Sequence, residues 1–476
     1  MSGSDPARVL GLAETGARRQ VSLSVVSGRQ HTHVLGGTGS GKSTLLANLA
    51  LSDAAAGRGV VLIDPKGDLV DDVLARLPEE SLSRLVLIDP AETTAPPTLN
   101  VLDGADPEVA VDQVTGVFAR IFSAWWGPRT DDVLRSALST LVRRPGASLA
   151  DVPRLLTDAA WRAPLVGELS GPGRADAAGL AGFWAHFDSL SAGGQAQVIG
   201  PVMNKLRAVL GRRFARDLLG SGSSSFDLGA VLDGGVLLVR LPKGALGEDT
   251  ARLVGSLVVA RAWQAATARA GRWQRRDAVI YVDECQNFMN LPGTLGDLLA
   301  EARGYHVGLV LAHQHLAQLP RDLAEAVSAN ARNKVYFNCS PEDARVLARH
   351  TEPAVPAAVL SRLGDHRVAV RLVRSGAELS AFTLATRPLP PPIPGRAVAA
   401  RAAARANAGR PAEARRAEEL ARRRRPRRDG DPGGPGGVSV GVSGGVLDPP
   451  ASRPNKPQPR GGPTPASVDP DSWSIS

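Results

Sequence analysis

The chain has 476 residues, of which 43% are hydrophobic, enough for a sizeable core or for two packed domains and a tail. Its formal net charge is +9, but the stretch 396–428 alone holds twelve Arg and three Glu, so the body is nearly neutral. Its two cysteines, Cys285 and Cys339, exclude a disulfide framework and a cysteine-rich metal site, and fit a reduced, intracellular setting.

The sequence does not indicate a secreted or membrane-spanning protein. No run of residues approaches the roughly 18 apolar residues of a membrane span. The first residues, Met1–Pro6, lack the basic and apolar regions of a signal peptide. We therefore expect a cytoplasmic chain with no membrane span of its own, which only a partner would recruit to the inner face of the cell membrane.

The first hundred residues alternate apolar runs with helical patterns. An apolar run ends at Val34-Leu35, residues 45–51 indicate a helix, and residues 59–63 and 85–88 indicate buried strands. Continuous apolar strands alternating with helices predict a parallel sheet covered on both faces. We expect a β-rich lead-in over residues 1–28 and the first part of the sheet domain over 29–105.

Helical patterns replace the strands between residues 106 and 225, which predicts an inserted all-α domain. Within it, the pair Trp125-Trp126 could stack on nucleic-acid bases. Burial among the helices is the expected position for two such aromatic side chains.

Apolar strands return after the helical segment. They lie at residues 235–239, 278–282, 307–312 and 334–337, followed by a closing hairpin over 368–386. These elements predict the second part of the sheet domain over 226–388. Residues 389–476 are rich in Arg, Pro and Gly, and we expect a disordered tail whose Ala/Arg-rich beginning could be partly helical.

A glycine-rich segment between the first apolar run and its helix matches the P-loop pattern G-x-x-x-x-G-K-[ST] in full. Glycines let backbone N–H groups turn towards phosphates, and the helix N-terminus adds positive potential. Lys42 would then reach the β- and γ-phosphates of ATP, and the Ser43 hydroxyl would ligate Mg²⁺. The alternative is a glycine-rich turn that only imitates the pattern. The predicted ATP-binding residues are Gly36, Gly37, Thr38, Gly39, Ser40, Gly41, Lys42, Ser43 and Thr44.

The strand over residues 278–282 ends in Asp283 and Glu284. At the carboxyl edge of a parallel sheet, such a strand delivers its two acids beside the phosphates. Asp283 would support Mg²⁺, and Glu284 would polarise the attacking water as the catalytic base. Without a P-loop the same pattern would be an ordinary solvated strand end.

The next strand, over residues 307–312, ends in His313-Gln314-His315. Gln314 at that edge would sense the γ-phosphate or orient the water. The His-x-His pair has no third ligand nearby and is expected to be structural. Arg303, which precedes the strand, is a candidate arginine finger, with an ordinary surface arginine as the alternative.

Lysine is rare among the 56 basic residues of this chain. A lysine that persists in an arginine-rich sequence suggests a position that needs a compact ammonium group. This argument singles out Lys42, in the P-loop, and Lys66, in the Asp-Pro-Lys-Gly segment after the second strand. The sequence does not define a role for Lys66.

Several of these segments together resemble the conjugative type IV coupling ATPases of the TraG/TraD type, within the FtsK/HerA P-loop motor superfamily. The resemblance rests on residues 36–44, 64–69, Leu99-Asn100, 283–288 and Gln314. It implies an α/β, RecA-like P-loop ATPase with a mostly parallel twisted sheet, an inserted all-α domain and a hexameric assembly. It also implies transport of DNA or nucleoprotein towards a secretion channel, and a trans-acting role for Arg303. Members of this family typically begin with transmembrane helices, which this chain does not show.

Three functions remain open from the sequence. The first is a DNA-translocating motor of the conjugation type, with DNA, relaxase-type proteins and a secretion channel as partners. The second is a soluble HerA-like ATPase in DNA processing, for which an Asp-Pro-His-Gly segment would be expected instead of Asp-Pro-Lys-Gly. The third is a non-motor P-loop scaffold that recruits protein substrates through its arginine-rich tail.

Overall fold

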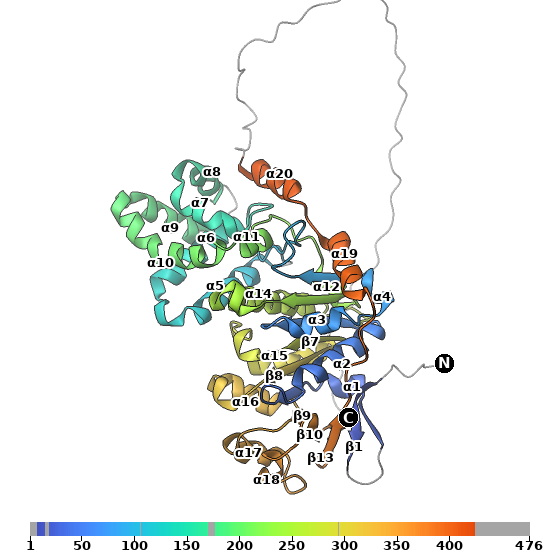
Figure 1. Cartoon of the computed structure of the whole chain (residues 1–476). Coiled ribbons are helices and arrows are strands. Elements are labelled where there is room, and N and C mark those ends of the chain that lie inside the picture. Colours follow the sequence, from blue (N-terminus) through green and yellow to red (C-terminus); the bar gives the residue numbers. More distant parts are fainter. Residues whose placement is uncertain (1–6, 15–18, 105, 170–176, 294, 424–476) are drawn as a thin grey trace, which may run out of the picture. The chain divides into compact units, whose positions relative to one another are not determined.

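The computed structural model describes residues 7–14, 19–104, 106–169, 177–293 and 295–423. A large sheet runs through the middle of them (Figure 1). It has 11 strands in the order β2-β1-β13-β10-β9-β3-β8-β7-β4-β6-β5. Its strands are β1 (Arg8–Ala13), β2 (Gln20–Leu23), β3 (Thr32–Leu35), β4 (Gly59–Asp64), β5 (Leu85–Ile88), β6 (Val236–Arg240), β7 (Ala278–Val282), β8 (Val307–His313), β9 (Asn333–Tyr336), β10 (Arg367–Arg371) and β13 (Phe382–Thr386). The mostly parallel sheet expected from the sequence is therefore confirmed.

The strands from β9 to β5 in this order are all parallel, and helices cover both of their faces. Alternate side chains of β4 enter two different clusters: Val61 and Ile63 join one core, and Val60 and Leu62 join the other. This two-sided burial explains why β4 is a continuous apolar run rather than an alternating one.

The remaining strands close the sheet on one side with antiparallel pairs. β10 pairs with β9 and with β13, which confirms the hairpin expected over 368–386, and a short ribbon of β11 (Val373–Arg374) and β12 (Ala377–Glu378) continues it. β1 pairs with β13 and β2 with β1. The segment expected as a lead-in is thus part of the main sheet, because its edge satisfies the backbone of β13.

Helices follow one another over the stretch for which the sequence indicates an inserted all-α domain. They are α5 (Pro107–Ile121), α6 (Pro128–Leu141), α7 (Val152–Thr157), α8 (Ala159–Leu169), α9 (Ala178–Ser189), α10 (Ala192–Leu210) and α11 (Arg213–Leu219), with short 3-10 turns at Ser123–Trp125 and Leu149–Asp151. The core of this segment holds Trp184, which is fully buried and donates from Nε1 to Thr140 Oγ1 at 2.8 Å.

The helices on the sheet faces and between the strands complete the fold. They are α1 (Val25–Gly28), α2 (Lys42–Ala55), α3 (Asp68–Leu74), α4 (Glu79–Leu82), α12 (Leu228–Leu232), α13 (Lys243–Leu246), α14 (Glu248–Thr267), α15 (Leu295–Ala302), α16 (Arg321–Asn330), α17 (Pro341–Leu347), α18 (Ala357–Leu360), α19 (Arg396–Ala408) and α20 (Ala412–Arg423). Within the described ranges, none of the helices combines the length and hydropathy needed to cross a bilayer.

The structure places the boundary of the tail later than residue 389. Ala400 and Ala404 of α19 are buried in the core that includes α2 and α3, and Arg401 forms an ion pair with the buried Asp89 at 2.5 Å. Further on, Glu418 of α20 accepts hydrogen bonds from Ser221 Oγ at 2.7 Å and from the Gly222 amide at 2.6 Å. Alanine at every fourth position gives α19 an apolar stripe that arginine-rich composition conceals. The rest of the expected tail, residues 424–476, lies outside the described residues.

The expectation that Trp125 and Trp126 are both buried is wrong for Trp125. Trp125 ends a 3-10 turn after α5, where its side chain is 80% exposed. Trp126 is half-buried, and its Nε1 donates to Asp131 at 3.1 Å. Two neighbours in an extended or turn segment face different ways, so only one of them can join the helical core.

Candidate active site

The P-loop connects the carboxyl end of β3 to the first turn of α2. Gly41 caps α2 with a φ of 102°, in the left-handed region that favours glycine. A Cβ at Gly36 would lie 2.6 Å from Ser40 Oγ and 2.7 Å from Phe337 Cβ, so only glycine fits there. At these glycines no side chain covers the backbone amides next to the N-terminus of α2, which is the arrangement that binding of a phosphate chain requires.

Lys42 and the two acids after β7 meet at this edge of the sheet. Lys42 Nζ lies 2.9 Å from Asp283 Oδ1 and 3.2 Å from Glu284 Oε1, and all three residues are buried. Burial by itself lowers the pKa of the Lys42 ammonium, but Asp283 and Glu284 outweigh it and raise that pKa above its ordinary value. The lysine is thus fully charged and pre-positioned for a polyanion.

Glu284 has a backbone conformation that is unusual for its residue type. Its φ is 49°, in the left-handed region, which a non-glycine residue adopts only when its surroundings fix it. The carbonyl of Glu284 accepts hydrogen bonds from the backbone amide and the side-chain Nδ2 of Asn287, both at 2.9 Å. Lys243 Nζ in turn holds the side-chain oxygen of Asn287 at 2.5 Å. These contacts turn the Glu284 carboxylate towards the P-loop.

The carboxylate of Glu284 is surrounded by donors. Oε1 accepts from Lys42, Lys66 and Gln314 Nε2, and Oε2 accepts from Gln286 Nε2 at 3.1 Å. Burial alone would raise the pKa of Glu284, but the Lys42 charge and the hydrogen bonds from Gln314 and Gln286 lower it to about 2. Glu284 is therefore a carboxylate at any physiological pH.

Gln314 links the strand end of β8 to the P-loop. Besides its bond to Glu284, its Oε1 accepts from Thr38 Oγ1 at 3.2 Å. One side chain therefore contacts both the loop that would hold the γ-phosphate and the carboxylate that would act on water. This is the position predicted for it from the end of the 307–312 strand.

Lys66 also belongs to the site, although no role for it can be predicted from the sequence. Its Nζ lies 3.3 Å from Glu284 Oε1, with the side chain 46% exposed. The Asp64 carboxylate holds the turn, since it accepts from the amides of Lys66 at 2.8 Å and Val70 at 3.1 Å. Two features of the sequence point to Lys66: the scarcity of lysine in this chain, and the Asp-Pro-Lys-Gly segment that contributes to the family resemblance.

A buried histidine pair lies behind Gln314. Nε2 of His33 and Nε2 of His313 are 2.7 Å apart, His313 Nδ1 lies 3.1 Å from the His315 carbonyl, and Tyr336 Oη lies 3.5 Å from His33 Nδ1. Because a carbonyl only accepts, His313 must carry its proton on Nδ1, and His33 then donates from Nε2. Burial lowers the pKa of His313 to about 4 and that of His33 well below its ordinary value, so both rings stay neutral. Sequence reasoning missed this pair, since its members are 280 residues apart.

The remaining predicted residues lie where their positions in the chain suggest, but Arg303 lies too far from the P-loop to reach it. Ser43 and Thr44 are half-buried in the first turn of α2. Arg303 is exposed in the 3-10 turn Arg303–Tyr305, at the amino end of β8, whereas the P-loop lies at its carboxyl end. β8 has 7 residues, so about 23 Å of strand separates Arg303 from the P-loop of its own chain. Arg303 therefore does not reach the P-loop of its own chain.

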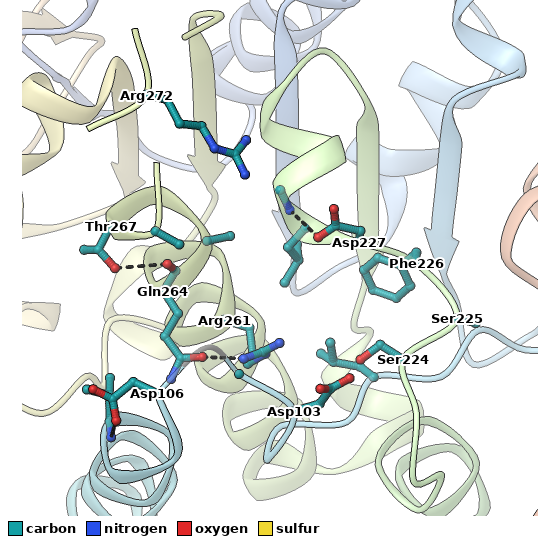
Figure 2. Close-up of a pocket in the computed structure, with 17 residues that line it drawn as sticks. Asp103, Asp106, Ser224, Ser225, Phe226, Asp227, Arg261, Gln264, Thr267 and Arg272 are labelled. Carbon is teal, nitrogen blue, oxygen red and sulfur yellow. Dashed lines mark hydrogen bonds between the residues drawn. The ribbon is translucent and has the colours of Figure 1, made fainter. Parts of the chain in front are cut away.

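In the described part of the chain, no group of three or more His, Cys, Asp or Glu side chains is arranged to hold an ion. A separate hollow of about 820 Å³ lies beside α14, and both acidic and basic side chains line it (Figure 2). Its walls include Asp103, Asp227, Arg261 and Arg272, and none of the predicted site residues. It is a different site from the P-loop.

Two family models match the chain. The model described as the central domain of helicase HerA matches residues 9–110, which include the P-loop. The model described as the TraM recognition site of TraD and TraG matches residues 277–351, which include Glu284 and Gln314. No curated protein matches the chain.

Solved structures of coupling proteins share the fold. The unbound bacterial conjugative coupling protein TrwB is 17% identical over 80% of this chain and 89% of that one, with a TM-score of 0.57. TrwB in complex with a non-hydrolysable ATP analogue is 17% identical over 82% of this chain and 96% of its own, with a TM-score of 0.55. VirB4 of Thermoanaerobacter pseudethanolicus is 16% identical over 82% and 99%, with a TM-score of 0.53. The resemblance to HerA and to TraD and TraG is thus confirmed over the two matched segments, and the solved coupling proteins share the α/β fold of this chain.

Proposed function

We propose that this chain, with the fold of the coupling ATPases, is an ATP-driven motor that moves DNA or nucleoprotein in conjugation or type IV secretion. The observation that carries the proposal is the convergence of Lys42, Asp283, Glu284 and Gln314 at the mouth of the P-loop. TrwB structures with an ATP analogue and with ADP and Mg²⁺ support ATP and Mg²⁺ as the ligands.

The residues around the P-loop fit a nucleoside triphosphate. Residues 36–41 would bind the phosphates through their backbone amides. Gly36 and Gly41 have to be glycines, because protein atoms already occupy the space that a Cβ at either position would fill. Lys42 would exchange its contacts with Asp283 and Glu284 for the β- and γ-phosphates. Ser43 and Asp283 would hold Mg²⁺, which neutralises charge on the phosphates when it is bound.

Hydrolysis would depend on Glu284 and its neighbours. Glu284, held in place through Asn287, would accept a proton from the attacking water as general base. Gln314 contacts Glu284 and Thr38, so it would orient the water with respect to the γ-phosphate. Lys66 would hold the same carboxylate from the solvent side once Lys42 has moved to the phosphates.

Arg303 requires a second subunit. Because it lies at the opposite edge of the sheet from its own P-loop, it would reach the nucleotide of an adjacent copy in a ring, such as a hexamer. An arginine finger accelerates phosphoryl transfer by about 10³–10⁵. Mixing Arg303→Ala and Lys42→Ala chains should restore partial activity, because a mixed interface pairs an intact P-loop with an intact finger. No recovery in chains shown to co-assemble would refute the trans role.

The response of the ATPase to DNA separates the two DNA-dependent functions from the protein-recruiting scaffold. The ATPase rate should be measured with no DNA, with single-stranded DNA and with double-stranded DNA, and with Lys42→Ala as the inactive control. We expect stimulation by DNA, which both the conjugation motor and a HerA-like DNA-processing ATPase predict. An ATPase that DNA leaves unchanged would favour the scaffold that recruits proteins. A relaxase-type protein or a secretion channel at the membrane would be the further partner of the conjugation motor only.

A further inference from the structure

The loop between α14 and β7 carries the most exposed large apolar side chain of the described residues. Trp273 is 99% exposed, and the loop around it is basic, with Arg272, Arg275 and Arg276. We refer to residues 271–276 as the Trp273 loop. A tryptophan gains nothing from full exposure to water, whereas it is among the residues that contribute most when an interface buries them.

The Trp273 loop is attached to the turn that holds Arg303. Arg275 Nη1 donates to the Gly304 carbonyl at 2.6 Å, and Arg275 Nε donates to the Arg272 carbonyl at 3.0 Å. Arg272 is also paired with Asp233 at 3.1 Å. Both sides of Trp273 are thereby fixed to the body of the chain.

Trp273 and Arg303 therefore lie at the same edge of the sheet. β7 and β8 are adjacent parallel strands whose first residues, Ala278 and Val307, are paired, so the segments before them leave the sheet at the same edge. The Arg275 side chain bonds the residue after Arg303, so the Trp273 loop lies next to the turn that holds Arg303, and one partner surface can contact both.

We propose that Trp273 anchors the interface between two copies of this chain, packing on the P-loop side of the adjacent copy next to Arg303. This inference rests on the ring in the proposed function and specifies how its subunits meet. The receiving edge offers apolar surface: Val346 of α17 and Val359 of α18 are 45% and 42% exposed. These helices follow β9, and the His366 amide behind them donates to the Ser40 carbonyl of the P-loop at 3.2 Å.

The test separates assembly from catalysis in the full chain. Sedimentation and specific ATPase activity are measured against protein concentration for the parent, Trp273→Ala, Arg303→Ala and the matched control Trp125→Ala. Trp273→Ala should raise the concentration of half-assembly about 30-fold, which corresponds to ~2 kcal/mol for an aromatic anchor. Its ATPase should recover to the parent plateau at high concentration. Arg303→Ala should instead lower the plateau at an unchanged midpoint, and Trp125→Ala should change neither.

Each contrary outcome has a definite meaning. If Trp273→Ala assembles at the parent concentration, or if the parent stays monomeric throughout, the proposal is overturned. If the variant assembles normally but loses affinity for a fluorescein-labelled single-stranded 30-mer, Trp273 is a DNA contact, which also overturns it. Because sedimentation needs no ATPase, an inactive parent would refute the proposed function while the interface is still tested. Trp273→Tyr, which keeps an aromatic ring, should retain most of the assembly.

Discussion

Replacing Glu284 by Gln should stall hydrolysis and at the same time strengthen the response of the protein to ATP. The substitution keeps the shape of the side chain but removes its charge, so it imitates the protonated carboxyl group. The pKa of Glu284 is about 2 against an ordinary 4.5, a difference of roughly 2.5 units at ~1.4 kcal/mol each. The nucleotide-free Gln variant should therefore lose about 3–4 kcal/mol of folding stability at neutral pH.

The sign of this effect gives a second measurement. A carboxylate with a lowered pKa stabilises the fold above its ordinary pKa of 4.5, and that contribution is lost as the pH falls from 4.5 towards 2. The stability difference between parent and Glu284→Gln should shrink over the same range. The control is Glu325→Gln, because Glu325 is exposed on α16, away from the P-loop.

ATP should stabilise the Glu284→Gln variant more than it stabilises the parent. In the parent, Lys42 must leave both Asp283 and Glu284 to reach the phosphates, whereas in the variant only Asp283 holds it with a full charge. The melting temperature of Glu284→Gln should therefore rise more on adding ATP than that of the parent. Phosphate release should fall at least 10²-fold, the lower end of general-base effects. A variant that hydrolyses ATP near the parent rate would refute the assignment of Glu284 as the base.

Further predictions concern the tail, the histidine pair and Lys66. Removing residues 424–476 should leave the melting temperature unchanged, whereas removing 389–476 should lower it by several degrees, since α19 then no longer covers the sheet; equal melting temperatures would contradict the packing of α19. His33→Phe should lower kcat several-fold without changing the affinity for ATP, because His313 loses its donor and no longer holds the segment of Gln314. In the parent, the pKa of His313 near 4 means that its imidazole takes up a proton between pH 6.5 and 4 in the unfolded chain and not in the folded chain. The contribution of His313 to stability should therefore fall over that range by about 3 kcal/mol, measured by urea unfolding. Lys66→Ala should reduce hydrolysis by no more than about tenfold, since its half-exposed contact with Glu284 is screened by water, while Lys42→Ala should abolish it.

Local patterns in the sequence predict most of the nucleotide site. The P-loop, the strand ending in Asp283-Glu284 and the strand ending in Gln314 each have a short-range signature, and parallel strands bring their carboxyl ends to one edge. The contacts that tune these residues have no such signature. The pairing of His33 with His313 and the hydrogen bonds from Asn287 to the Glu284 carbonyl depend on strand order and on a single left-handed residue, neither of which composition reveals.

The predictions for the C-terminal segment and for Trp125 failed for a different reason. Arginine-rich composition favours disorder after residue 388, and this average hides Ala400, Ala404 and Ala408, whose spacing by four makes one apolar stripe. For Trp125 the error is of the opposite kind. Hydrophobicity favours burial, but only the position of the residue in its turn decides which of two adjacent tryptophans the helices can cover.

The packing of α19 on β5 has a consequence for how the chain is made. β5 is the last strand of the sheet, and its outer edge is covered by the C-terminal segment: Asn407 Nδ2 donates to the Leu85 carbonyl at 2.9 Å, across 322 residues of chain. At the usual 5–20 residues per second, a ribosome needs about 16–64 s to add those residues. For that time the nascent protein presents an apolar strand with unpaired backbone groups, the kind of edge on which chains aggregate. Expression of this protein should therefore depend on chaperones that bind emerging chains, and more strongly for variants that lack α19.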